Sequence, residues 1–163
     1  MAVTLEEQKK ARLKAMKLLE YMERSEKALT ERLEKEEFSA DAIRDAVEYV
    51  KAFGYVDDVR YARNYLAYRM SVKSKQKLMQ ELYSKGIDRE TAEIAWEEAS
   101  ELEEPDERAI IRNTIEKKYE AGTELSEKEM RRLYGQLARK GFRSGDIFSV
   151  LDEMEISVMY EKY

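Results

Sequence analysis

A hydrophobic pattern that occurs three times limits what this chain can fold into. In each copy, five apolar residues follow one another at spacings of 4, 5, 5 and 4. A spacing of four keeps two side chains on one face of a helix, and a spacing of five steps across a break, so each copy predicts helix, tight turn, helix. The three sets are Leu29, Leu33, Phe38, Ile43 and Val47; Leu78, Leu82, Ile87, Ala92 and Trp96; and Leu133, Leu137, Phe142, Ile147 and Leu151.

The residues at the predicted turns agree with this reading. Lys85-Gly86 and Lys140-Gly141 place a cation in the last helical turn and a glycine at the left-handed position that follows it. In the first copy this position holds Glu37, and a side chain there costs about 1 kcal/mol or more. The helices after the turns are expected to be capped by Ser39, Asp88 and Ser144.

A further helical stretch precedes each pair, at residues 13–23, 58–70 and 107–118, so the repeating unit is three helices. Single units of this size bury too little apolar surface to be stable alone, and stacking supplies the rest. The predicted fold is all-α, an elongated, curved array of three tandem three-helix repeats with boundaries at 1–54, 55–103 and 104–163. Six additional residues in the third repeat are expected to form a loop at residues 121–124.

Local patterns predict further details of the helices. Thr4 with Glu7, and Ser126 with Glu129, have the spacing of a capping box. Tyr61, Tyr65 and Tyr68 recur at helical spacing, which predicts one buried face used for packing. The alternative interpretation of the same stripe is a platform on which nucleic-acid bases stack.

Composition excludes most catalytic chemistry. The chain has no Cys and no His, so thiolate zinc sites, thiol nucleophiles and Ser-His-Asp triads cannot form. The phosphate-binding Gly-x4-Gly-Lys-Ser/Thr pattern is also missing, and with 35 carboxylates adjacent acidic pairs arise freely. We therefore expect no enzyme activity, no catalytic residue, no metal and no cofactor. The acidic start and the lack of a long apolar run predict a cytoplasmic protein with no membrane contact.

Charge is strongly segregated along the chain. Residues 60–89 hold eight basic and two acidic residues, residues 90–107 hold nine acidic and no basic ones, and residues 131–143 hold five basic and no acidic ones. Such basic runs suit phosphates or an acidic protein surface, and the alternative is an ordinary solvated helix face. The candidate partner-binding residues are Arg60, Arg63, Arg69, Lys73, Lys75, Lys77, Arg131, Arg132, Arg139 and Arg143.

Two motifs resemble those of a known family, the RecX regulatory proteins that modulate the RecA recombinase. Gly54–Ala62 resembles the family's glycine-tyrosine-aliphatic signature, and Glu81–Ile87, echoed by Leu137–Phe142, is similar to its Leu-x-x-Lys-Gly turn. Departures are Ser74-Lys75, where the family commonly has Gly-Pro, and Glu37. We interpret the signature positions as architectural: Gly54, Tyr55, Asp58, Tyr61, Ala62, Gly86 and Gly141.

The resemblance implies three tandem three-helix repeats without catalytic activity. It also implies binding in the helical groove of the RecA-DNA filament, which restrains filament growth, ATP turnover and strand exchange in DNA repair and recombination. We expect the protein itself to be a monomer. Weak binding of single- or double-stranded DNA could assist this docking. The alternative, from the basic runs alone, is an independent helical DNA-binding module.

Overall fold

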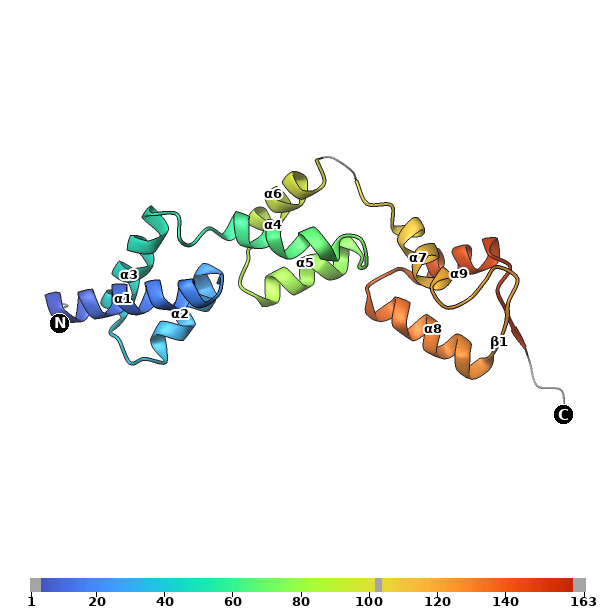
Figure 1. Cartoon of the computed structure of the whole chain (residues 1–163), viewed down its shortest axis with the longest axis horizontal. Coiled ribbons are helices and arrows are strands. Elements are labelled where there is room, and N and C mark those ends of the chain that lie inside the picture. Colours follow the sequence, from blue (N-terminus) through green and yellow to red (C-terminus); the bar gives the residue numbers. More distant parts are fainter. Residues whose placement is uncertain (1–3, 102–103, 160–163) are drawn as a thin grey trace. The chain divides into compact units, whose positions relative to one another are not determined.

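The computed structural model describes residues 4–101 and 104–159 (Figure 1). Within these ranges the structure consists of α-helices and one pair of short strands, in agreement with the predicted all-α class. The elements are α1 (Leu5–Tyr21), α2 (Glu26–Glu34), α3 (Ala40–Ala52), α4 (Asp58–Arg69), α5 (Lys75–Ser84), α6 (Arg89–Ala99), α7 (Glu107–Glu116), β1 (Glu124–Ser126), α8 (Glu127–Arg139), α9 (Ser144–Glu153) and β2 (Ser157–Met159).

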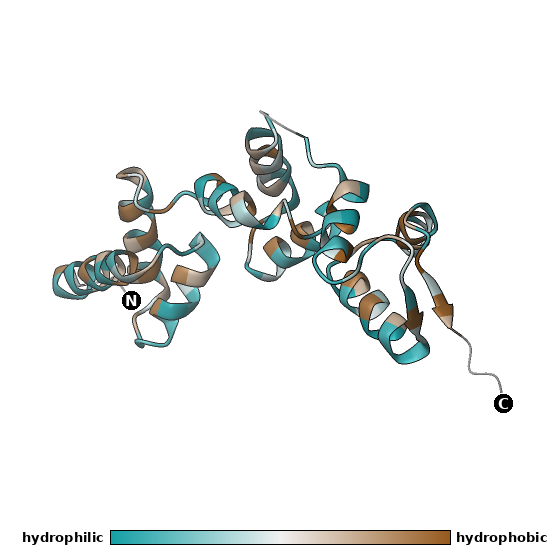
Figure 2. Cartoon of the chain, turned by 45° about the vertical axis from the view of Figure 1, so that its right-hand side comes forward, coloured by the Kyte–Doolittle hydropathy of each residue, from teal (hydrophilic) through white to brown (hydrophobic). Residues whose placement is uncertain are grey.

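The helices fall into three consecutive triplets, α1–α3, α4–α6 and α7–α9, as the repeated pattern predicts. Every residue of the three hydrophobic sets is buried except Phe38, which is partly buried. Helices such as α8 are hydrophobic along one side and hydrophilic along the other (Figure 2). The tandem three-helix organisation is therefore confirmed, whereas the elongation, the curvature and the boundaries at 1–54, 55–103 and 104–163 stay predictions.

The chain divides into two compact units. The first comprises the described residues up to Leu66 together with Glu81–Ala99, and the second comprises Ala67–Gln80 together with the described residues from Ser100 onward. In the first unit α1 packs on α2 and α3 around a core that includes Ala11, Leu29 and Ile43. Small alanines on α1 allow this close packing, because Ala11 and Ala15 are fully buried.

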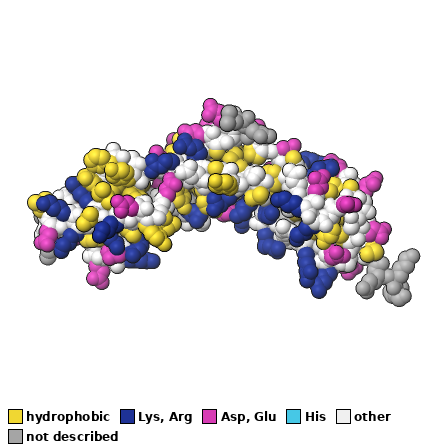
Figure 3. Space-filling model, in the orientation of Figure 1, with side chains coloured by type: hydrophobic (Ala, Val, Ile, Leu, Met, Phe, Trp, Pro, Cys, Tyr) yellow, Lys and Arg dark blue, Asp and Glu magenta, His cyan; other side chains and the backbone are white. Residues whose placement is uncertain are grey.

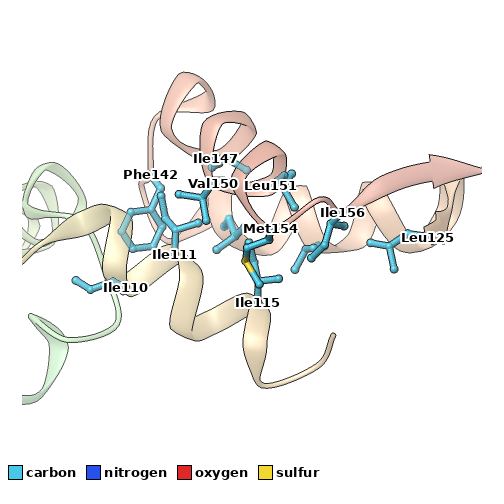
Figure 4. Close-up of a cluster of buried hydrophobic side chains, with 12 residues drawn as sticks. Ile110, Ile111, Ile115, Leu125, Phe142, Ile147, Val150, Leu151, Met154 and Ile156 are labelled. Carbon is cyan, nitrogen blue, oxygen red and sulfur yellow. The ribbon is translucent and has the colours of Figure 1, made fainter. Parts of the chain in front are cut away.

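The core of the second unit is formed by α7, α8 and α9. In Figure 4, Ile111 and Ile115 of α7 point toward Val150 and Met154 at the other side of the cluster. Leu125 of β1 and Ile156, which precedes β2, are buried in the same cluster. The strands thus extend the core of the third triplet.

The predicted loop at residues 121–124 is wrong in part, because its last residue opens strand β1. β1 pairs in parallel with β2, with Glu124 opposite Ser157 and Ser126 opposite Met159. A 2.8 Å hydrogen bond from the Gly122 N–H to the Met154 carbonyl also links the loop before β1 to the end of α9. Strands of three residues are too short to show an alternating pattern in the sequence.

Most predicted caps are confirmed, with two corrections. Ser39 and Asp88 each accept a hydrogen bond from the backbone N–H three residues further on, and Ser126 with Glu129 forms a complete capping box. The cap of α9 is Arg143 rather than Ser144, and no side chain bonds to the helix there. Thr4 caps α1 as predicted, and the Glu7 carboxylate instead accepts the Ser39 N–H at 2.8 Å.

The tyrosine stripe predicted to be the buried face of α4 is not that face in the structure. The buried residues of this helix are Ala62 and Leu66, both fully shielded from solvent. Tyr65 lies at the edge, where its hydroxyl donates to Glu81 Oε1 at 2.8 Å, and Tyr68 is 83% exposed. The three tyrosines therefore do not form one buried face, because the apolar side of α4 is centred one residue further round the helix.

The first and second triplets are joined by hydrogen bonds at the start of α2. The Ser25 hydroxyl, which caps α2, donates to the carbonyl of Lys85 at 2.8 Å. The next backbone N–H, that of Glu26, donates to Asp58 Oδ1 at 2.8 Å. The N-terminus of α2 is therefore completed by the turn after α5 and the first residue of α4.

The second and third triplets are joined in the same manner at the start of α5. Ser74, at the position equivalent to Ser25, donates its backbone N–H to the carbonyl of Lys140 at 3.0 Å. The N–H of Lys75 donates to Glu107 Oε1 at 2.8 Å. Ser25 and Ser74 are both almost fully buried. We call the hydrogen-bonded arrangement at each of these two borders the joint. The Ser25 hydroxyl bonds across its joint, whereas the Ser74 hydroxyl accepts the N–H of Lys77 in α5.

The joint also explains which turns require glycine. Gly86 has φ +89° and Gly141 has φ +91°, as predicted. A Cβ on Gly86 would lie 2.5 Å from the Cβ of Lys27, and one on Gly141 would overlap the stem of Lys77. Glu37 adopts the same left-handed conformation, with φ +63°, and is exposed. Close packing of the turn against the preceding triplet therefore excludes a side chain at the two glycines.

Candidate partner-binding surface

The signature positions play structural parts. Gly54 has φ +75° and directs the chain away from α3, and Tyr55 lies half exposed with its ring stacked on Phe53 at 5.9 Å. Asp58 caps α2 rather than its own helix, whose first turn is instead capped by Asp57 through a 3.1 Å bond from Arg60 N–H.

Two arginines of the first basic run are used within the fold. Arg60 Nη1 donates to the Gly54 carbonyl at 2.8 Å, and Arg60 Nε lies 3.5 Å from a carboxylate oxygen of Glu23. Arg63 Nη1 forms a 2.8 Å ion pair with Glu98 Oε2, which links α4 to α6. A carboxylate thus compensates each of these charges, so the two residues are weaker candidates for partner contact.

The other members of the first run lie around the start of α5. Lys75 and Lys77 have their backbone N–H groups in the cap of α5, and the stem of Lys77 packs beneath Gly141. Arg69 ends α4, and Lys73 follows it with its N–H bonded to the Arg69 carbonyl at 2.9 Å. All four side chains are partly buried. They are held close to the second joint.

The second basic run is exposed. Arg131, Arg132 and Arg139 project from α8, and Arg143 stands at the start of α9. In Figure 3, Lys and Arg side chains gather over α8 on the visible face of the molecule. This surface is available for an anionic partner.

The fold also brings together four lysines that the sequence does not place side by side. Burial lowers the pKa of Lys140, and the positive charges of Lys117, Lys118 and Lys73 lower it further. We call these four residues the lysine cluster. They come from the end of α8, the end of α7 and the loop before α5. Lys118 Nζ donates to Gln136 Oε1 at 3.4 Å, which is a neutral partner.

Three of the four lysines in the cluster have no carboxylate partner in the described part of the chain. Among residues 4–101 and 104–159, Lys117, Lys118 and Lys140 form no ion pair with a carboxylate. Mutual repulsion is unfavourable in the free protein, and an anion between the ammonium groups relieves it. Lysine serves as a point charge for phosphate groups, so the arrangement suits a phosphate. The sequence does not reveal this cluster, because the basic and acidic residues at 108–130 balance.

None of the described helices combines the length and the apolar character needed for a membrane crossing.

Three models of the RecX family match the chain in order. The first three-helix domain of RecX matches residues 11–49, the second matches residues 57–95 and the third matches residues 106–151. Each match lies within one helical triplet of the structure.

Curated relatives carry the same family name. The chain is 34% identical over 88 residues to the regulatory protein RecX of Caldanaerobacter subterraneus subsp. tengcongensis, covering 53% of this chain and 45% of that protein. It is 31% identical over 78 residues to the regulatory protein RecX of Clostridium acetobutylicum, covering 48% and 36%. The matches thus span less than half the length of these relatives.

Solved structures share the fold. A crystal structure of RecX from Lactobacillus salivarius superposes with a TM-score of 0.69 at 20% identity, covering 93% of this chain and 99% of that one. A second crystal structure, of regulatory protein RecX, gives a TM-score of 0.64 at 19% identity, covering 90% and 73%. With all three family domains matched in sequence order and the same helical triplets in the structure, this chain belongs to the RecX family of regulatory proteins.

Proposed function

We propose that this protein acts in the cytoplasm as a non-enzymatic regulator that binds the RecA-DNA filament and restrains filament growth, ATP hydrolysis and strand exchange. The observation that carries the proposal is the match of all three repeats to RecX domains, whose curated relatives are named regulatory proteins. A chain of packed helices with an exposed cationic surface suits docking on a charged filament.

The contact surface that we assign to this function combines the lysine cluster with the exposed arginines of α8. Arg131, Arg132 and Arg139 supply fork-shaped donors for phosphate or carboxylate oxygens. Lys117, Lys118 and Lys140 of the lysine cluster add positive charge that forms no ion pair with a carboxylate of the described residues. Arg60 and Arg63 are left out of this surface because their charges are paired with Glu23 and Glu98.

The test measures ATP hydrolysis by the cognate RecA on single-stranded DNA while this protein is added in rising amounts. Inhibition is expected at near-stoichiometric amounts. The triple variant Lys117→Gln, Lys118→Gln, Lys140→Gln is expected to be about tenfold less potent, since three exposed charge pairs at about 0.5 kcal/mol each give that factor. A matched variant with the same charge change, at exposed Lys9, Lys17 and Lys35, should keep full potency. Absence of inhibition by the unmodified protein would refute the proposal.

A second candidate function, an independent DNA-binding module, is favoured by the lysine cluster. If it holds, the protein binds duplex DNA without RecA, and the logarithm of its affinity falls with the logarithm of salt concentration with a slope of about −0.9 per phosphate contact. Four lysines then predict a slope of about −3.6. Fluorescence anisotropy with a labelled duplex separates the two functions, because a RecA-dependent regulator shows filament inhibition with at most weak binding to the free duplex.

A further inference from the structure

A groove lies between α2 and α3 of the first repeat. It has a volume of about 560 Å³. Its floor is apolar and consists of Phe38, Ile43 and Val47. Its rim is acidic and includes Glu26, Glu34 and Glu48. We call it the acidic groove.

The rim carries excess negative charge. Glu26 pairs with Lys51 at 3.2 Å, and Arg44, the cation that lines the groove, is turned to Asp41 at 3.3 Å. For Glu34 and Glu48, no ion pair exists within the part of the chain that the structure describes. The negative field at the groove is therefore only partly compensated by the fold.

A second hollow on α2 extends this negative surface. It shares Glu26, Thr30 and Glu34 with the acidic groove and adds two carboxylates, Glu31 and Asp58, and one cation, Lys27. Burial raises the pKa of Asp58, and the charge of Glu26 contributes to the same rise. Carboxylates thus accumulate along α2 on both sides of the helix.

In the third repeat, aromatic side chains cover the surface that is equivalent to the acidic groove of the first repeat. The residues equivalent to Thr30 and Arg44 are Tyr134 and Phe148, whose rings stack at 5.3 Å. The residue equivalent to Glu26 is Met130, and it packs with Tyr134 on the core of that repeat. In the first repeat, Thr30 lines the groove and its hydroxyl donates to the Glu26 carbonyl at 2.9 Å, so no aromatic pair covers this surface.

The geometry points to a docking site in the first repeat for a basic, apolar segment of another protein. A Lys or Arg of that segment meets Glu34 and Glu48, and a neighbouring aliphatic or aromatic side chain covers Phe38, Ile43 and Val47. Charge complementarity selects the basic partner, and the apolar floor requires a side chain that replaces the missing Tyr-Phe pair. This inference does not depend on RecA being the partner.

The probe for the test is a labelled helical peptide of Lys and Leu in amphipathic spacing, titrated with the full chain and followed by fluorescence anisotropy. The decisive variant is Thr30→Tyr with Arg44→Phe, which copies the closing pair of the third repeat. It removes a positive charge, so attraction by charge alone would strengthen binding, whereas a filled groove weakens it. We expect the dissociation constant to rise about tenfold, as for loss of an anchor side chain from its pocket.

Matched controls separate charge from shape. Glu34→Gln with Glu48→Gln should weaken peptide binding about threefold or more, and the same change at exposed Glu20 and Glu127 should leave it nearly unchanged. A peptide in which Ser replaces Leu should bind the unmodified chain less tightly. In methyl NMR spectra, the peptide should shift the signals of Ile43 and Val47, and circular dichroism checks that each variant is folded.

Several results would overturn the inference. These are no binding of the Lys-Leu peptide, equal binding of the Lys-Ser peptide, unchanged binding to the filled variant, or methyl shifts confined to other parts of the chain. Self-association of the unmodified protein that disappears in the filled variant would assign the groove to a second copy and would also overturn it. RecA inhibition is measured separately, so failure here leaves the proposed function untouched.

Discussion

Asp58 Oδ1 accepts a 2.8 Å hydrogen bond from the backbone N–H of Glu26, the first residue of a helix in the preceding repeat. A carboxylate at this position accepts a hydrogen bond from an N–H that has no partner within the helix, and its negative charge is attracted to the positive end of the helix dipole. Burial disfavours the charged form of the Asp58 carboxyl, and this is the main reason that its pKa is raised. The equivalent residue in the third repeat, Glu107, makes the same bond to Lys75.

Removal of the Asp58 acceptor should destabilise the protein. Asp58→Ala is expected to lower the free energy of unfolding by about 1–2 kcal/mol, as for loss of a helix cap. Asp58→Asn keeps an oxygen acceptor and removes the buried charge, so its loss should be smaller. Urea denaturation followed by circular dichroism at neutral pH measures both, and equal losses would argue against the hydrogen bond as the main contribution.

Alanine at Gly86 should be more costly than alanine at Gly54. Both glycines have positive φ, but a Cβ on Gly54 meets no atom within 4 Å, whereas one on Gly86 overlaps Lys27. The left-handed conformation alone costs about 1 kcal/mol, and overlap adds about 1–3 kcal/mol. Chemical denaturation of Gly54→Ala and Gly86→Ala tests the difference. Similar losses of unfolding free energy would show that Lys27 moves aside to accommodate the methyl group at little cost.

Glycine at position 37 should stabilise the protein. Glu37 is held at φ +63°, so Glu37→Gly relieves about 1 kcal/mol of backbone strain and should raise the melting temperature by about 2–4 °C. As a control, Glu31→Gly places glycine at an exposed position inside α2 and should lower the melting temperature by a similar amount. A drop in melting temperature for Glu37→Gly would contradict the interpretation that Glu37 is strained at its positive φ.

The pair of Arg12 and Asp45 should make stability depend on pH in the acid range. Arg12 Nε and Nη2 each lie 2.8 Å from an oxygen of Asp45, and these hydrogen bonds lower the pKa of Asp45. Because the folded-state pKa is lower, the contribution is complete above the unfolded value of about 3.9 and is lost as pH falls through the folded one.

The variant Asp45→Asn tests the contribution of the Arg12–Asp45 pair to stability. The variant should be less stable than the unmodified protein at neutral pH, and the difference should shrink as the pH is lowered below about 4. Urea unfolding at a series of pH values provides the measurement. A difference that stays constant down to the most acidic condition would exclude the ionised carboxylate as its source.

Phosphate should stabilise the free protein through the lysine cluster. An anion between Lys73, Lys117, Lys118 and Lys140 relieves their repulsion, so the melting temperature should rise more in phosphate than in sodium chloride of equal ionic strength. The triple Gln variant at Lys117, Lys118 and Lys140 should lose this excess. An equal response of both proteins would show that phosphate acts elsewhere or only through general salt effects.

Local patterns were sufficient to predict the helices of this fold. The spacing from Leu29 to Val47 and its two copies located the helix pairs, because helical periodicity and turn glycines act over a few residues. β1 and β2 were missed, since their pairing joins Glu124 to Ser157 across a whole helix pair. The exposed position of Tyr68 was also missed, because an i, i+4, i+7 pattern of amphipathic tyrosines does not show which side of α4 faces the core.

The candidate surface was less predictable than the fold. The charge runs identified Arg131, Arg132 and Arg139, which are exposed, but included Arg60 and Arg63, which pair with acids distant in sequence. The lysine cluster joins residues from three separate segments, so no window along the chain could show it. Folding decides which charges are compensated, and that information lies in tertiary contacts.

The joint affects how the family can diverge. In the Ser74–Lys140 hydrogen bond both bonding groups are main-chain atoms, which every residue except proline can supply in full. Most side chains there can therefore drift during evolution without loss of the contact. Insertion or deletion of one residue beside Ser74 would instead shift donors away from acceptors, so length at these borders should be under stronger selection than residue identity.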